Sequence, residues 1–189
     1  NALGYSGFTD LQRIYRERLV ARSATYRERI EQLRRVGGDQ GHVLPQLVDS
    51  SIRELERLRE HLDPRRLQAA TGLILGAGAV FLLAQRRAFP VASYLAYGLA
   101  QLEVRAILLD SIAGMLRQQV GMIGRNDVLL AASFRNYTPE VIDAADAAQR
   151  QGATVIAITD HPVSPLARTA KVTIEIAQAR ERLTVLRDQ

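Results

Sequence analysis

Apolar runs of four to seven residues alternate with helix-like segments after residue 70, and this alternation restricts the possible folds more than any other feature of the sequence. From these runs we predict five strands, at residues 72–75, 104–109, 127–132, 153–159 and 171–177. The runs are largely apolar along their whole length rather than at alternate positions, which is typical of parallel strands buried on both faces. Right-handed crossovers then predict an α/β fold: a doubly wound, five-stranded parallel sheet flanked by helices, in the flavodoxin-like order 2-1-3-4-5.

The segments between the predicted strands carry the signals of turns and helices. We expect a tight turn at residues 76–79, followed by a long helix to about Leu102 that is kinked at Pro90. Further helices are expected over residues 111–122, from Pro139 to a stop at Gly152, and briefly from Ser164-Pro165. Each strand is therefore followed by a crossover segment, as a parallel sheet requires.

The first 66 residues are predicted to be helical. Apolar residues recur at helical spacing from Phe8 to the Gly37-Gly38 pair, and again from about Pro45 to His61. Asp63 followed by Pro64 indicates the start of another short helix. These apolar stripes could pack within one chain or form the seam of a dimer, and the sequence leaves both interpretations open.

Composition excludes several kinds of site. The 189-residue chain has no Cys, so it has neither a disulfide nor a thiol nucleophile, and its three His residues are too far apart in sequence to suggest a metal site. The net charge of +5 comes from basic residues interspersed with acidic ones, which favours a solvated surface over a nucleic-acid-binding stripe. No signal peptide or membrane helix is evident, and we expect a cytoplasmic protein.

Two loops at predicted strand ends have unusual compositions. One runs from Gly76 to Val80, and the other from Ser133 to Thr138. In the order 2-1-3-4-5 the topological switch point lies between the first and third strands, where ligands bind beyond the carboxyl ends. Glycine backbone, hydroxyl groups and the start of the helix at Pro139 would together suit an anion. Thr138 is also predicted to cap that helix.

Two common nucleotide-binding motifs are absent. A dinucleotide fingerprint that begins at Gly76 would need a third glycine at Phe81, and a phosphate-binding loop of the Walker type would need a lysine near its end. The only lysine in the chain is Lys171. We therefore predict no cofactor and no resident metal.

The second half of the chain resembles the SIS (sugar isomerase) domain. The family pattern S-x-S-G-x-T-x-E, a strand ending in T-D and a later S-P-L-A are matched by Ser133, Thr138, Glu140, Thr159-Asp160 and the residues 164–167. The sequence LILGAGAV corresponds in this resemblance to the family's G-x-G-x-S loop. The resemblance covers about residues 67–177 and implies a pocket for a sugar phosphate or sugar acid.

The N-terminal sequence LGYSGFTDLQRIYRERL resembles the end of the helix-turn-helix domain in RpiR-family bacterial transcription regulators. That resemblance implies three parts: the tail of a truncated DNA-binding domain at 1–20, a helical linker or dimerisation segment at 21–66, and a SIS-type ligand domain at 67–189. It further implies DNA as a partner through the missing N-terminal domain, a role in carbohydrate-metabolism genes, and a homodimer or homotetramer.

The chain departs from the family pattern at three positions that concern the ligand. Val80 stands where the glycine loop should end in Ser, and Arg135 and Asn136 replace a Ser and a Gly. Arg135 could supply a charge-assisted contact to an anion or could point to solvent. The ligand-binding residues that we predict are Gly76, Gly78, Val80, Ser133, Arg135, Asn136, Tyr137 and Thr138.

A sugar-phosphate isomerase is the alternative to a regulator. Aldose–ketose isomerisation needs a positioned base, and only Glu140 and His161 are candidates, although a helix-dipole role and a surface position explain them as well. We therefore predict no catalytic residue. Arg86 and Arg87 are expected on the long helix, where a ligand role is open but an ion pair or a solvated face is the default interpretation.

Overall fold

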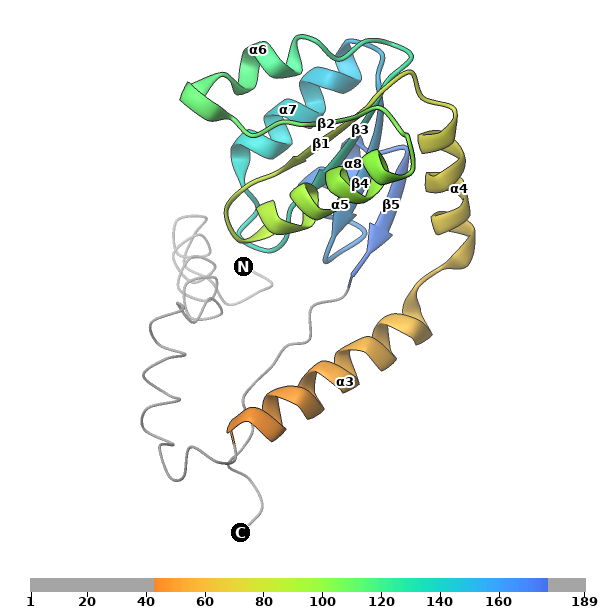
Figure 1. Ribbon diagram of the computed structural model, residues 1–189, viewed down its shortest axis with the longest axis vertical. Coiled ribbons are helices and arrows are strands. Elements are labelled where there is room, and N and C mark those ends of the chain that lie inside the picture. The colour runs from red at the N-terminus through yellow and green to blue at the C-terminus, as the bar shows by residue number, and fades with distance from the viewer. Residues whose placement is uncertain (1–42, 177–189) are drawn as a thin grey trace, which may run out of the picture. The chain divides into compact units, whose positions relative to one another are not determined.

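The computed structural model describes residues 43–176 of the chain (Figure 1). Its α-helices are α3 (Val43–His61), α4 (Pro64–Leu75), α5 (Phe89–Gln101), α6 (Leu116–Val120), α7 (Pro139–Arg150) and α8 (Pro165–Thr169). Its strands are β1 (Val80–Ala84), β2 (Ala106–Leu108), β3 (Val128–Ala132), β4 (Thr154–Thr159) and β5 (Val172–Glu175). Short 3₁₀ turns, η2 (Arg86–Ala88) and η3 (Ile112–Gly114), follow β1 and β2.

The chain divides into two compact units, residues 1–52 and 53–189. Of the first unit the structure describes only residues 43–52, the beginning of α3. The predicted helix that starts at Phe8 and the proposed DNA-binding tail lie outside the described residues. The predicted second helix, from about Pro45 to His61, corresponds to α3.

The sheet confirms the predicted topology. All four strand pairs are parallel, and the order is β2-β1-β3-β4-β5. The central pair, β1 and β3, is in register from Val80 opposite Val128 to Ala84 opposite Ala132. The predicted strands two to five overlap β2 to β5 closely, because each is an apolar run bounded by polar or turn residues.

The predicted first strand is wrong. Residues 72–75 are the last turn of α4, and the first strand is Val80–Ala84. The helix begins at Asp63, whose carboxylate accepts a hydrogen bond from the Arg65 N–H, and Gly76 is its C-cap. A short apolar run fits either a strand or one turn of a buried helix, and here the cap signals at both ends decide for the helix.

The long helix predicted after the glycine turn is also wrong. Its first part is β1, and the helix proper, α5, begins only at Phe89. Pro90 lies in the first turn of α5, where its missing N–H costs nothing, so proline starts this helix instead of kinking it. The predicted helix at 111–122 is likewise shorter, because η3 precedes α6.

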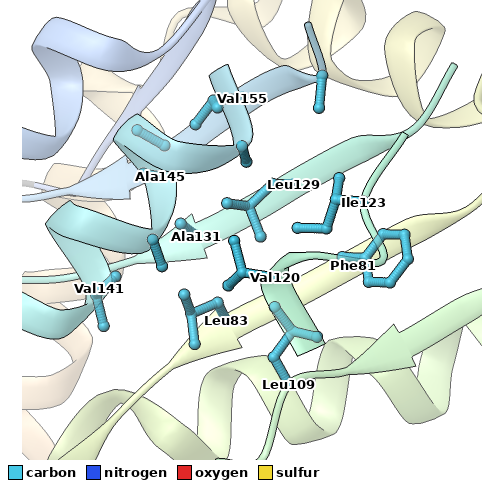
Figure 2. Close-up of a cluster of buried hydrophobic side chains, with 14 of the residues drawn as sticks. Phe81, Leu83, Leu109, Val120, Ile123, Leu129, Ala131, Val141, Ala145 and Val155 are labelled. Carbon is cyan, nitrogen blue, oxygen red and sulfur yellow. The ribbon is translucent and has the colours of Figure 1, made fainter. Parts of the chain in front are cut away.

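Helices cover both faces of the sheet (Figure 1). On one face, apolar residues of α4 and α5 belong to the same core cluster as the even-numbered residues of β1. Within it α5 lies against β1 and β2, and α4 lies against β5. On the other face Phe81 and Leu83 form a second cluster with apolar residues of α6 and α7, such as Val120 and Val141 (Figure 2). Leu166 of α8 belongs to the same cluster, where α8 lies against β4 and α7. All five β1 side chains are buried, which accounts for its uninterrupted apolar sequence.

Gly152 has a conformation that other residues rarely adopt. Its φ is +90°, and an added Cβ would lie 3.0 Å from the Cγ of Arg125. A Cβ added at Gly98, within α5, would have no atom within 4 Å outside its own helix turn and chain neighbours.

We expect Gly152→Ala to lower the free energy of unfolding by about 1–2 kcal/mol, because it forces a left-handed alanine against a neighbour. Gly98→Ala is the matched control and should raise it by roughly 0.5–1 kcal/mol through better helix propensity. Urea unfolding of both variants measures this. Equal effects of the two changes would contradict the conformational argument.

No helix within residues 43–176 combines the length and apolar character needed to cross a bilayer.

Candidate functional site

The two predicted ligand loops lie at opposite edges of the sheet. Residues 76–79 precede β1, and the Gly78 N–H donates to the carbonyl oxygen of Asn126, which precedes β3, at 2.8 Å. The loop from Ser133 to Thr138 follows β3 and lies at the carboxyl edge. Because the strands are parallel, the prediction that Gly76, Gly78 and Val80 face this loop across one pocket is wrong. Val80 is a buried residue of β1 itself.

Ser133 shapes the loop after β3. Its side chain is buried, and its Oγ accepts a hydrogen bond from the Thr138 N–H at 3.1 Å. Thr138 occupies the predicted N-cap position of α7, but its side chain makes no capping hydrogen bond. The hydroxyl that closes this turn is therefore the one on Ser133.

Asn136 takes over the backbone role of the glycine that it replaces. Its φ is +63°, in the left-handed region. Asn is among the few residues other than glycine that adopt this region readily. The replacement therefore preserves the bend of the loop and adds a polar side chain to it.

Arg135 is held by a buried carboxylate. Its Nε lies 3.8 Å from Oδ2 of Asp160, the residue that follows β4. The Arg135 side chain is 54% exposed and that of Asp160 only 5% exposed, so the guanidinium is accessible while its counter-ion is enclosed. Tyr137 lies nearby. The pKa of its hydroxyl is raised, mainly because the group is partly buried and also because it is hydrogen-bonded to Asp160 and close to the charge of that carboxylate. Arg135 thus pairs through Nε with a buried carboxylate, while its side chain stays exposed enough to contact an anion.

The loop after β1 is a part of the candidate site that the predicted positions of the strands do not place there. It contains Gln85, Arg86 and Arg87, which the sequence pattern predicts on a helix. Arg87 Nη2 donates to the carbonyl oxygen of Arg135 at 3.0 Å, so the loops after β1 and β3 lie side by side. When the family's G-x-G-x-S pattern is moved to this loop, its named positions fall on Ala84, Arg86 and Ala88.

A polar network joins the β1 loop to the loop after β2. Gln85 Nε2 donates to Ser111 Oγ at 3.1 Å, and the Ser111 N–H donates to Gln119 Oε1 at 3.1 Å. Gln119 Nε2 donates in turn to Asp110 Oδ1 at 2.8 Å. This hydrogen bond, together with that from the Ile112 N–H, lowers the pKa of Asp110. The network therefore ties the loop after β1 to the loop after β2, on the side opposite to β3.

Left-handed backbone recurs in these loops. Among residues other than glycine with positive φ, Arg86 follows β1, Ser111 and Ala113 follow β2, and Asn136 follows β3. Such conformations are unfavourable for L-residues and cluster at functional sites. Their recurrence after three neighbouring strands marks the carboxyl edge around the β1–β3 switch point as the candidate site.

The two candidate catalytic residues have ordinary surroundings. Glu140 is exposed in the first turn of α7. His161 is exposed, and its Nδ1 accepts a hydrogen bond from the Val163 N–H at 3.3 Å. Neither makes a side-chain hydrogen bond or ion pair with another ionisable group of residues 43–176.

A separate groove of about 390 Å³ lies between α4 and β5. Its lining includes Arg65, Arg66 and Lys171, and it shares no residue with the β1 and β3 loops. Arg66 Nη1 donates to the Thr173 carbonyl oxygen at 3.3 Å, and its Nε lies 3.7 Å from Oδ2 of Asp63. This groove is a second place where an anion could bind, so it supplies a control for experiments on the candidate site. Residues 43–176 contain no group of His, Asp and Glu side chains suited to a metal ion.

Comparison with protein families identifies the domain. The family model for the SIS domain matches residues 73–186. Among curated proteins, the chain is 29% identical over 129 residues to the bifunctional protein glk of Paraburkholderia xenovorans, covering 68% of this chain and 20% of that protein. It is 29% identical over 115 residues to the arabinose 5-phosphate isomerase KdsD of Pseudomonas aeruginosa, covering 61% and 35%. The chain thus spans about a fifth of the length of the first relative and about a third of the second.

Solved structures share the fold. The sugar isomerase domain of an RpiR transcription factor from Sphaerobacter thermophilus superposes with a TM-score of 0.67 at 25% identity, covering 70% of this chain and 74% of that one. The NanR protein of Vibrio vulnificus, complexed with ManNAc-6P, superposes with a TM-score of 0.69 at 20% identity, and the match covers 93% of this chain and 59% of that one. The c3406 protein of E. coli CFT073, in complex with arabinose 5-phosphate, gives 0.59 at 20% identity and covers 78% and 81%.

Proposed function

Because the chain belongs to the SIS domain family, we propose that it is the effector-sensing part of a transcription regulator of the RpiR type and binds a phosphorylated or acidic sugar. The ligand would lie at the carboxyl edge, between the loops after β1 and β3. The observation that carries this proposal is the meeting of these two arginine-bearing loops at the switch point, tied by the hydrogen bond from Arg87 to the Arg135 carbonyl.

The chemistry of the loops supports an anionic ligand. Arg86, Arg87 and Arg135 come from the two loops, and neither loop contains an acidic residue. The dipole of α7, which begins at Pro139, adds positive potential at the same edge. The ligands named in two structures of this fold, ManNAc-6P and arabinose 5-phosphate, are sugar phosphates and are the first compounds to test.

The predicted glycine loop is not part of this proposed site. Of the predicted ligand residues, we keep Ser133, Arg135, Asn136, Tyr137 and Thr138, and we add Arg86 and Arg87. Ser133 and Asn136 would set the shape of the loop. The Ser133 hydroxyl accepts a hydrogen bond from the Thr138 N–H, and the backbone of Asn136 is in the left-handed region. Arg135 would contact the anion.

The experiment that tests the proposal is a thermal-shift titration of the protein with ManNAc-6P and arabinose 5-phosphate, each compared with its unphosphorylated sugar. A ligand that binds only the folded state raises the melting temperature by mass action. We expect at least one sugar phosphate to raise it and the matching neutral sugar to do so much less. No shift with either phosphate, nor with a wider panel of sugar phosphates and sugar acids, would reject the proposed ligand class.

A sugar-phosphate isomerase is the second candidate, and the similarity to KdsD is the observation that favours it. Incubation with arabinose 5-phosphate, followed by detection of a ketose product, separates the two functions. We expect binding without turnover. Turnover that is lost on Glu140→Gln or His161→Asn would establish the enzyme instead.

We further propose that α3 mediates self-association into a homodimer or homotetramer. Leu44, Val48 and Ile52 recur at helical spacing, and they are 69%, 48% and 49% exposed. An amphipathic helix with an uncovered apolar stripe buries it most simply against a second copy.

Light scattering at micromolar concentration should therefore give at least twice the 20.9 kDa of the chain. The double change Val48→Glu and Ile52→Glu should shift the protein to a monomer, because it places charge on the stripe. Arg53 is exposed and, nine residues after Leu44, lies on the opposite face of α3, so Arg53→Gln is the control and should leave the mass unchanged. A monomeric wild-type protein would contradict this proposal.

A further inference from the structure

We propose that Arg86 is a ligand-binding residue of the candidate site and that its guanidinium selects for phosphate esters over the corresponding neutral sugars. The inference rests on the function proposed above and extends it to a residue that stands where the family pattern, placed after β1, has glycine. Three independent features of Arg86 support it: its backbone conformation, the way that its neighbours are held, and the charge around it.

The backbone of Arg86 is in the left-handed region, with a φ of 56°. Arginine gains nothing from this conformation, which glycine adopts without cost. The family pattern, once placed after β1, has glycine at this position. An unfavourable residue at a site where glycine would serve the fold better indicates that its side chain has a use.

The residues on both sides of Arg86 are tethered to neighbouring loops. Gln85 is bonded to Ser111 after β2, and Arg87 is bonded to the carbonyl oxygen of Arg135 after β3. These two hydrogen bonds fix the short segment from opposite directions. The backbone of Arg86 is therefore held between them at the switch point, so the ligand has to order only its side chain.

The charge of Arg86 has no counter-ion within the described residues 43–176. Its side chain is exposed and forms no ion pair or hydrogen bond there. Two carboxylates at this edge have other partners: Asp160 pairs with Arg135, and Asp110 accepts hydrogen bonds from Gln119 and Ile112. The third, Glu140, is exposed in the first turn of α7 and forms no ion pair with Arg86. The Arg87 guanidinium contacts only a neutral carbonyl oxygen.

This distribution of charge points to a doubly charged partner. The positive charge of Arg135 is offset by Asp160, whereas those of Arg86 and Arg87 are not. A phosphate monoester carries between one and a half and two negative charges at neutral pH, and guanidinium groups bind it through charge-assisted hydrogen bonds. The two uncompensated arginines match such a group in charge.

Two substitutions of Arg86 separate its charge from its backbone. Arg86→Gln removes the charge and keeps the strained backbone, whereas Arg86→Gly removes both. Calorimetric titration with ManNAc-6P and arabinose 5-phosphate should show affinity roughly tenfold or more lower for both variants, as expected for the loss of a hydrogen bond between charged groups. Thermal melting without ligand should show a higher melting temperature for Arg86→Gly than for the wild-type protein, and little change for Arg86→Gln.

Lys171→Gln, in the groove beside β5, is the matched control, since it also removes one exposed positive charge. Its affinity for the sugar phosphates should equal that of the wild-type protein. A wild-type protein that binds a sugar phosphate only as tightly as both Arg86 variants do would overturn this inference and leave the proposed function intact. Equal weakening by Lys171→Gln would also overturn it, because the effect would then reflect net charge. A wild-type protein that binds no sugar phosphate would overturn both.

Discussion

Replacing Arg135 by alanine is expected to remove most of the stabilisation that a sugar phosphate gives to this protein. At a ligand concentration one hundred times the dissociation constant, the wild-type fold should gain about 2.7 kcal/mol. Loss of a hydrogen-bonded charge costs about 1.5–3 kcal/mol of affinity, so at the same concentration the variant should gain only about 0.3–1.3 kcal/mol. Thermal or urea unfolding with and without ligand measures both quantities.

The unliganded stability of the Arg135→Ala protein should change less. The guanidinium is about half exposed and lies 3.8 Å from its partner, so the pair contributes only about 0.5–1 kcal/mol. Lys171→Ala is the control for charge removal and should keep the full ligand effect. If the Arg135→Ala protein responds to ligand as the wild type does, Arg135 is not a ligand contact, and its only role is to pair with Asp160.

Ser133→Ala is expected to destabilise the fold even without ligand, by about 1–3 kcal/mol in the free energy of unfolding. The change removes the buried acceptor of the Thr138 N–H and leaves that donor unpaired in a turn where both side chains are largely buried. Urea unfolding measures this loss as a lower midpoint concentration, with the dependence of the free energy of unfolding on urea concentration unchanged.

Thr138→Ala is the matched comparison and should cost less than Ser133→Ala. The Thr138 side chain occupies the N-cap position but accepts no hydrogen bond from the first turn of α7, so the cap that is normally worth about 1 kcal/mol is not formed there. A larger loss for Thr138→Ala than for Ser133→Ala would show that Thr138 caps α7 in solution and would contradict the arrangement described here.

The sheet could be predicted because its later strands are bounded by unambiguous signals. The run that forms β3 lies between Asp127 and the polar loop from Ser133, and β4 lies between Gly152 and Asp160. Neither strand carries a charge; β3 is apolar throughout, and β4 has threonine only at its two ends, so their type and limits follow from burial on both faces.

The first strand could not be placed in the same way. From Leu67 to Gln85 the sequence carries no charge, and a helix, a turn and a strand follow one another within it. Periodicity does not separate a buried helical turn from a buried strand over so few residues. Asp63 and Pro64 do predict the start of this helix, but nothing in the local pattern shows that it continues to its C-cap at Gly76.

The candidate site was half predictable for a related reason. The loop after β3 carries its signature in consecutive residues, so Ser133, Arg135 and Thr138 could be chosen from sequence alone. The loop after β1 could not, because the wrong position of the first strand put Arg86 and Arg87 on a helix. The left-handed backbone of Arg86 and the approach of Asp160 to Arg135 depend on tertiary contacts that no local pattern encodes.

The central claim is that a sugar phosphate binds at the carboxyl edge between β1 and β3. The most direct test follows backbone amide chemical shifts in the wild-type protein during titration with ManNAc-6P or arabinose 5-phosphate. The account predicts that the largest changes occur at residues 85–88 and 133–138. Changes concentrated at residues 65–69 and 171–173, beside β5, or at the glycine turn of residues 76–79, would contradict it.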